Sequence, residues 1–157
     1  MVFLPYGSGE LFSNYITWQK ITAKNNTVNK DVRLKVRPAD VSRMVIFAAE
    51  PACSRDSCAD KLTGVKPFVT YNDNDFQWLR QNGFTGARTG VYRVSEDSIR
   101  LAYDILARSG IATEPSASAG LALYLELYER GFINPTEKAL VINTGRGLLE
   151  DKGRVKL

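Results

Sequence analysis

Three short segments of the 157-residue sequence combine small, hydroxyl-bearing and acidic residues in arrangements that could bind an anionic ligand. The first is Gly7-Ser8-Gly9, which lies between a short apolar run and a stretch with helical spacing. Glycines at such a turn let backbone N–H groups approach an anion, and the N-terminus of the following helix adds a positive partial charge. The segment has neither the lysine of a Walker loop nor the six-residue dinucleotide fingerprint. An ordinary strand-to-helix turn is the competing interpretation.

The other two segments lie further along the chain. Glu114-Pro115-Ser116-Ala117-Ser118-Ala119-Gly120 places a carboxylate and two hydroxyls where an apolar helix begins. Asn143-Thr144-Gly145-Arg146-Gly147 follows another apolar run and offers a hydroxyl on a backbone made flexible by glycine. Each segment also has a purely structural interpretation, as a helix start with small residues for close packing and as a glycine turn. The chemistry therefore depends on whether the fold brings the three segments together.

The residue types that are scarce narrow the chemistry further. The sequence contains no histidine, which excludes a histidine base, a triad that contains histidine and a histidine-ligated metal. Cys53 and Cys58 are the only cysteines, and one such pair cannot supply four zinc ligands. We predict two free thiols and no metal site. The net charge of +4 is too small and too scattered to require a polyanionic partner.

Apolar runs that alternate with helical patterns predict the elements that position these segments. Runs at 2–5, 44–49, 90–94 and 139–142 are typical of strands, and residues 24–27 of a loop. Helical spacing or capping signals appear at 11–20, at 75–81, between Ser95 and Gly110, and at 116–128. The alternation predicts an α/β fold with three layers, in which an open and mainly parallel sheet carries helices on both faces. A short extended stretch is also predicted at Ile111 to Thr113, before Glu114. Ligands of such sheets bind at the carboxyl ends of the strands, where all three segments are then expected to lie.

The length of the chain predicts one α/β lobe over residues 1–150, followed by a charged and flexible tail at 151–157. A strand of buried character begins at residue 2 with no element before it. A parallel sheet does not usually begin in this way, so we expect the N-terminal part of a larger sheet to be missing.

Four motifs, in this order, resemble the large domain of the fold-type II pyridoxal-phosphate enzymes. That family includes threonine synthase, threonine and serine ammonia-lyases, cysteine synthase and the tryptophan synthase β chain. The motifs are Leu4-Pro5-Tyr6-Gly7-Ser8-Gly9-Glu10-Leu11, the segment from Arg37-Pro38-Ala39-Asp40 through the strand at 45–49 to its ending Glu50-Pro51, the helix start at 114–122, and Val141-Ile142-Asn143-Thr144-Gly145-Arg146-Gly147-Leu148. The resemblance covers residues 2 to about 150.

The resemblance implies pyridoxal 5'-phosphate as the cofactor and assigns roles to residues of the three segments. Gly7, Ser8 and Gly9 would hold the phosphate, Thr144 would meet the pyridine nitrogen, and Glu114 would lie near the ring. Gly145 would also belong to the cofactor-binding residues. A hydroxyl does not hold that nitrogen protonated as a carboxylate would. The ring is then a weaker electron sink, which suits elimination and replacement more than transamination.

One departure from the family decides what the chain could do alone. The family's Schiff-base lysine lies upstream of the glycine loop, in a part that this chain lacks, so no catalytic residue is assigned here. The resemblance implies a C-terminal fragment or split part of an enzyme that acts on an amino acid by β/γ-elimination or replacement. It would be inactive without the missing N-terminal half. A non-catalytic binding or regulatory module on the same fold is the alternative.

The expected partners are small molecules and other copies or parts of the protein. Relatives in the family are commonly dimers, which leaves a homodimer open. No run approaches the roughly 18 apolar residues of a membrane span, and the N-terminus lacks the basic region of a signal peptide, so we expect a cytoplasmic protein. The basic stretch at 20–37 has no interleaved aromatic residues, which argues against nucleic-acid binding.

Overall fold

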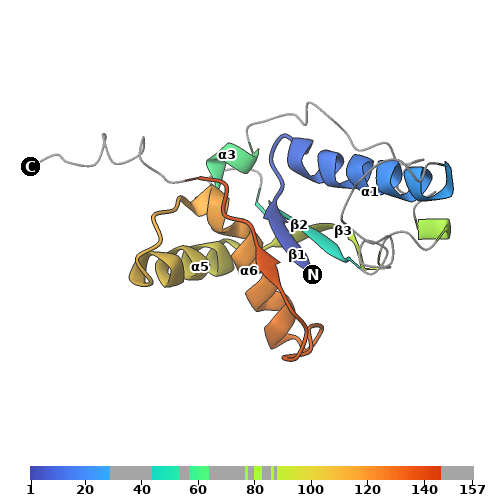
Figure 1. Cartoon of the computed structure of the whole chain (residues 1–157). Coiled ribbons are helices and arrows are strands. Elements are labelled where there is room, and N and C mark those ends of the chain that lie inside the picture. Colours follow the sequence, from blue (N-terminus) through green and yellow to red (C-terminus); the bar gives the residue numbers. More distant parts are fainter. Residues whose placement is uncertain are drawn as a thin grey trace, which may run out of the picture.

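A computed structural model gives the fold of the chain (Figure 1). It describes residues 1–28, 44–53, 57–63, 77, 80–82, 86 and 88–145. The strands are β1 (Val2–Pro5), β2 (Ile46–Pro51), β3 (Gly90–Val94) and β4 (Leu140–Val141). The helices are α1 (Glu10–Val28), α3 (Asp60–Thr63), α5 (Glu96–Arg108) and α6 (Pro115–Glu129).

The four strands form one sheet in the order β3-β2-β1-β4, and every neighbouring pair is parallel. Val2 of β1 pairs with Ile46 on one side and with Leu140 on the other. The chain therefore builds outward from β1 to β2 and β3, and then crosses back to place β4 on the opposite side of β1. The predicted parallel α/β sheet is confirmed, with strands near all four predicted positions.

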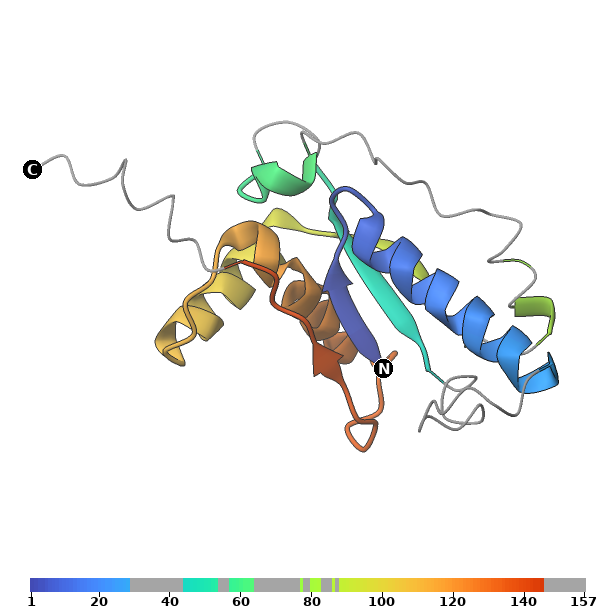
Figure 2. The ribbon, with the colours of Figure 1, turned by 45° about the horizontal axis from the view of Figure 1, so that its top comes forward.

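Helices cover both faces of the sheet, α1 on one side and α6 with α5 on the other (Figure 2). Side chains of a strand alternate between the two faces, and β1 shows this directly. Val2 and Leu4 pack in the cluster on the α1 side, while Phe3 belongs to the cluster on the α6 side. The Phe3 ring stacks on that of Phe47 at 4.7 Å between centroids. Both faces are thus buried, as the continuous apolar runs predicted.

The helix α6 lies unusually close to β1. A Cβ atom built on Gly120 would come within 3.2 Å of the Phe3 carbonyl oxygen, so this position has room for a glycine and little more. The helix starts with Pro115 in its first turn and ends at the cap Arg130, followed by Gly131 at a φ of 72°. These limits match the predicted buried helix.

The predicted cap of α5 is also present, and α6 reinforces it. The Ser95 hydroxyl accepts a hydrogen bond from the Ser98 N–H. The Glu126 carboxylate of α6 accepts from the Ser95 N–H at 2.9 Å and from the Ser95 hydroxyl at 2.8 Å. A carboxylate at a helix N-terminus satisfies a backbone donor and interacts favourably with the helix dipole. The two helices are therefore joined at the start of α5.

The predicted loop at 24–27 is wrong, because the backbone of α1 remains helical to Val28. Residues 10–28 contain neither glycine nor proline, and none of the residue types present costs more than about 0.7 kcal/mol in a helix. The polar residues that suggested a loop are therefore compatible with a helix. Of the predicted helix at 75–81, only residues 77, 80 and 81 are described, and they are helical. The tail at 151–157 lies outside the described residues. No helix in the described part has the length and hydropathy of a membrane span.

Gln19 provides a test of the core beneath α1. It follows Phe12 and Ile16 on the buried side of this helix and is fully buried. Neither its amide nitrogen nor its amide oxygen has a hydrogen-bond partner among the described residues. A buried polar group without a partner costs about 1–3 kcal/mol. We expect Gln19→Met, which keeps the length and removes the amide, to raise the unfolding midpoint by roughly 2–4 °C per kcal/mol recovered. The control Gln81→Met, at an exposed position, should not, and a lower midpoint for Gln19→Met would contradict this view of the core.

Glu126 provides a test with a pH dependence. Burial alone would raise the pKa of Glu126, but the hydrogen bonds from Ser95 outweigh it and hold the pKa below its ordinary value. A lowered pKa in the folded state stabilises the fold above the pKa of the unfolded carboxyl, and this stabilisation is lost as the pH falls through the folded value. We expect Glu126→Gln to lower the free energy of unfolding by about 1–3 kcal/mol at pH 7 and by less at pH 3. Chemical denaturation at both pH values measures this. Glu129→Gln, at an exposed position of the same helix, is the control.

Candidate functional site

The strand order creates one place where a ligand crevice is expected. The connection from β1 leads to β2 on one side, and the connection from β3 crosses back to β4 on the other side of β1. In open parallel sheets, ligands bind outside the carboxyl ends of the two strands where the connections diverge. Here these are β1 and β4. The glycine loop Gly7-Ser8-Gly9 follows β1, and the turn with Thr144 and Gly145 follows β4, so both lie at this point.

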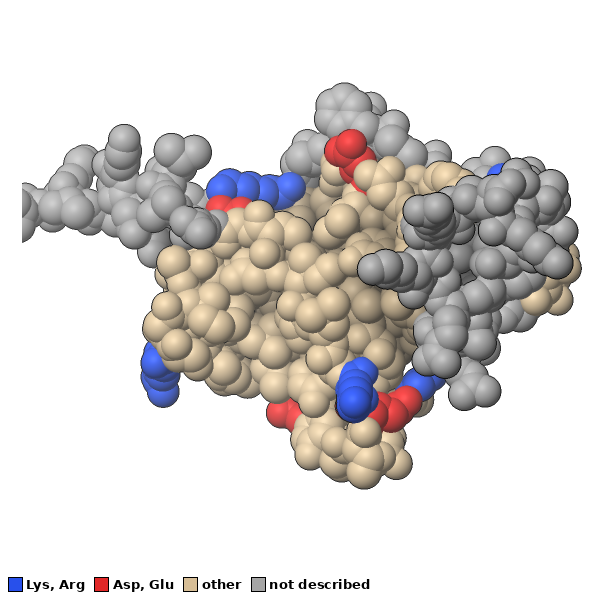
Figure 3. All heavy atoms as spheres, viewed as in Figure 1, with Lys and Arg blue, Asp and Glu red and all other residues tan. Residues whose placement is uncertain are grey.

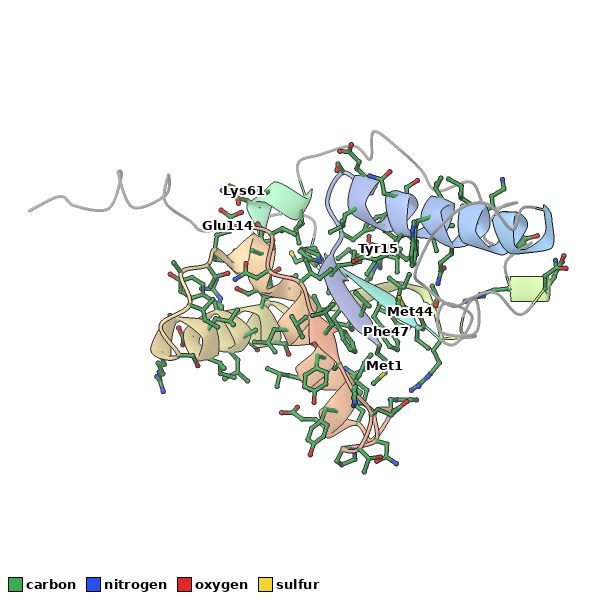
Figure 4. All side chains as sticks on the ribbon, viewed as in Figure 1. Met1, Tyr15, Met44, Phe47, Lys61 and Glu114 are labelled. Carbon is green, nitrogen blue, oxygen red and sulfur yellow. The ribbon has the colours of Figure 1, made fainter. Side chains whose placement is uncertain are left out.

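A chain of contacts joins these two loops through Lys61 and Glu114. A Cβ atom on Gly7 would lie 3.1 Å from the Leu62 side chain and 3.5 Å from the Lys61 carbonyl oxygen of α3. The Lys61 ammonium forms an ion pair with the Glu114 carboxylate at the start of α6. A Cβ atom on Gly145 would lie only 2.5 Å from the Glu114 Oε1 atom. The structure thus brings the three segments together at the carboxyl edge of the sheet. Figure 4 shows Lys61 and Glu114 next to each other there.

The glycine loop presents donors of the kind that bind an anion. Gly9 has a φ of 76°, which turns the chain into α1 in a conformation that favours glycine. The Ser8 hydroxyl accepts from the Glu10 N–H at 3.4 Å and keeps its own proton for another acceptor. The Ser13 N–H bonds to the Gly9 carbonyl at 2.9 Å, and the N–H groups that begin a helix before this bond have no partner within it. Glu10 is exposed.

The turn after β4 is shaped by Asn143. Its side-chain oxygen accepts from the Thr113 hydroxyl at 3.1 Å and from the Gly145 N–H at 3.4 Å. Thr144 is exposed between these two anchored residues, so its hydroxyl is accessible to a ligand. Residues 146 and 147 of the motif lie outside the described residues.

Three features of the site differ from what the sequence indicated. The predicted extended stretch before Glu114 is not a strand, because residues 111–114 form the loop between α5 and α6. The Ser118 hydroxyl donates to the Glu114 carbonyl at 2.9 Å, within its own helix, and Ser116 is buried, so both hydroxyls of this segment are enclosed in the fold. Lys61 was also not identified from the sequence as a residue of the site. It lies in a stretch without periodicity, and no motif singles it out. Only the position of α3 against Gly7 makes it part of the site.

The cysteines lie in the loop after β2, at the same edge of the sheet. Both are free thiols, Cys53 exposed and Cys58 partly buried. The Glu96 carboxylate accepts from the Ser57 hydroxyl at 2.6 Å and from the Cys58 N–H at 2.9 Å. Burial first, and then the Glu96 carboxylate, raise the pKa of the Cys58 thiol to about 11. Among the described residues, no group of three or more His, Cys, Asp or Glu is arranged to hold a metal ion.

Comparison with known proteins shows a likeness of fold. No protein-family model and no curated protein matches the sequence. Among solved structures, serine racemase from Dictyostelium discoideum is similar at a TM-score of 0.53 and 24% identity, over 94% of this chain and 43% of that one. A threonine deaminase from T.th. aligns at a TM-score of 0.49 and 19% identity, over 92% of this chain and 48% of that one. The chain spans less than half the length of either protein. The comparison therefore shows that this chain shares the fold of part of serine racemase.

The two thiols should differ in reactivity. A thiol reacts with iodoacetamide as the thiolate, and with a pKa of about 11 only about one Cys58 in a thousand is ionised at pH 8. We expect Cys53 to be alkylated first, Cys58 to lag by about tenfold or more, and Glu96→Gln to shorten that lag. Peptide mass spectrometry over a time course measures both rates. Equal rates in the folded protein at pH 8 would contradict the assignment, whereas equal rates in urea are expected.

Proposed function

We propose that this chain is part of a pyridoxal-phosphate-dependent enzyme that acts on an amino acid by elimination or replacement. The observation that carries the proposal is the convergence of Gly7, Glu114 and Gly145 at the point where the connections of the sheet diverge. These residues belong to three of the four motifs that resemble the fold-type II family. The likeness of fold to serine racemase, an enzyme that by its name acts on an amino acid, supports the same proposal.

The residues at this edge of the sheet have the chemical groups that the cofactor needs. A phosphate needs several donors and no side chain in the way, and the loop offers glycine backbone, one hydroxyl proton and the start of α1. Gly145 leaves the Glu114 carboxylate room that a Cβ atom would fill. The neutral hydroxyl of Thr144 is exposed at the turn after β4. A phosphate at one end and a neutral aromatic nitrogen at the other match this arrangement.

In the proposed complex each segment has one task. The N–H groups of Gly7 and Gly9 and the Ser8 hydroxyl donate to the phosphate. The Thr144 hydroxyl donates to the ring nitrogen without transferring a proton, and Glu114 lies beside the ring. When bound, the cofactor withdraws electrons from the substrate carbon next to its amino group. The residues of this chain bind and orient the cofactor, and none of them is assigned as a base.

The remaining parts of the proposed enzyme lie outside this chain. The chain spans 43% of the serine racemase chain. The resemblance to the fold-type II family implies that the lysine that holds the cofactor belongs to a segment upstream of the glycine loop. We propose that this segment supplies the lysine, that the chain alone is inactive, and that the complete protein works in the cytoplasm, as a dimer. A non-catalytic module that binds a phosphorylated ligand on the same fold is the second candidate. It is favoured by the donors for an anion that the chain holds without that lysine.

Cofactor titration of the purified chain tests the proposal. We expect saturable binding of pyridoxal 5'-phosphate by calorimetry, weaker binding of pyridoxal, and no turnover of serine or threonine. Ser8→Ala should weaken binding of the phosphorylated form by about tenfold and leave pyridoxal unaffected, because it removes one hydrogen bond to a charged group. Thr144→Ala should weaken both.

Thr136→Ala is the matched control, since its hydroxyl bonds to Asn134 in the loop before β4, at the opposite edge of the sheet. Turnover by the chain alone would contradict the assignment of catalysis to another segment. Equal affinity for the two forms of the cofactor would contradict phosphate binding at the glycine loop. Binding of phosphorylated ligands in general, with no preference for the pyridine ring and no effect of Thr144→Ala, would favour the non-catalytic module.

A further inference from the structure

We propose that Lys61 is a positioning residue of the candidate site, whose ammonium fixes the Glu114 carboxylate against Gly145 and cancels its charge next to the bound anion. The fixing of the carboxylate is a property of the chain without ligand. The effect on the anion rests on the proposed function. The two parts are therefore tested by separate measurements.

The ion pair crosses the site. Lys61 belongs to α3, which follows β2, whereas Glu114 contacts Gly145, which follows β4. Because β1 lies between β2 and β4, a side chain that reaches from α3 to Glu114 crosses the carboxyl end of β1, where the glycine loop begins. Figure 4 shows the two labelled side chains beside each other above the sheet. Figure 3, a space-filling picture from the same direction, shows a basic and an acidic side chain next to each other in this part of the surface.

The Glu114 carboxylate is held by contacts outside its own helix. Glu114 occupies the cap position of α6, yet its side chain makes no capping hydrogen bond. Only 13% of this side chain is exposed, and one of its oxygen atoms pairs with Lys61 while the other lies against Gly145. A carboxylate with so little exposure is costly without a cation beside it. The Lys61 side chain is 46% exposed, so its part in the contact comes from its charge and reach more than from buried area.

The charge of this pair matters for an anionic ligand. A phosphate monoester carries a charge of about −1.5 to −2 at pH 7. A bare carboxylate at the same edge of the sheet would repel it, and charges that are partly shielded from water interact over several ångströms. With Lys61 in place the pair is neutral. The site can then hold both the carboxylate and a phosphate.

The first experiment tests the fixing of the carboxylate without any ligand. Gly145→Ala places a Cβ atom 2.5 Å from the Glu114 oxygen, so the turn must shift unless the carboxylate moves away. If Lys61 holds it, the substitution lowers the unfolding midpoint by about 3 °C in the parent chain and by less than half as much in the Lys61→Met background. A midpoint change that is the same in both backgrounds overturns the fixing role, because a free glutamate side chain would move as easily with or without Lys61.

The second experiment tests the charge with pyridoxal 5'-phosphate as the probe and pyridoxal as its uncharged counterpart. We expect Lys61→Met to weaken binding of the phosphorylated probe by about tenfold and to leave pyridoxal nearly unchanged. Lys61→Arg should retain most of the affinity. Adding Glu114→Gln to Lys61→Met should restore affinity for the phosphorylated probe, because the repelling charge is then gone. A structural defect caused by Lys61→Met would not be repaired by a second substitution of this kind.

Arg130→Met is the matched control. Arg130 pairs with Glu126 at the other end of α6, and that glutamate side chain is 10% exposed, so the control breaks a comparable pair away from the site. It should leave the affinity for the probe unchanged. If the parent chain binds no probe, the proposed function fails, and the midpoint measurements still decide whether Lys61 fixes the carboxylate. If the parent binds and Lys61→Met binds equally well, the charge role of Lys61 is overturned while the proposed function stands.

Discussion

The burial of β1 is the constraint on which the rest of the structure depends. This strand of four residues is paired on both edges and covered on both faces. A ligand can reach the backbone of β1 only at the two ends of the strand. The chain turns directly after the carboxyl end, at the glycine loop. The short distance between α6 and β1 at Gly120 fixes the helix against the strand, and thereby fixes where the start of α6 lies relative to the carboxyl end of β1. The candidate site is a consequence of how tightly this one strand is enclosed.

The two ends of α6 show how one residue type can serve two purposes. Each end has a glutamate that is mostly buried and paired with a basic side chain, Lys61 at the start and Arg130 at the end. Glu126 also satisfies the backbone donor that begins α5, so its charge is fully used in joining two helices. Glu114 caps nothing and lies against a glycine turn. Hydrogen bonding, and not burial, separates the glutamate that holds the fold together from the one that faces the site.

Local patterns were enough to predict most of the fold, because its elements are defined by local signals. The apolar run at the start of the chain, the cap Ser95 and the proline of α6 each act within a few residues, and each prediction is confirmed. The extent of α1 was not predictable in this way, since its polar second half has residues that suit either a helix or a loop. Lys61 could not be found from sequence at all. Its role depends on a glutamate 53 residues away, and a separation of that size leaves no mark in a local pattern.

The same topology explains why binding and catalysis would be separable under the proposed function. The donors for a phosphate lie on the loop after β1 and the hydroxyl for a ring nitrogen on the turn after β4, so both come from strands that this chain contains. Nothing in the pairing of β1 with β4 requires a covalent anchor to be present for the loops to take up their positions. Under the proposed function, an anion site can therefore persist in a chain of this fold whether or not a reactive lysine reaches it.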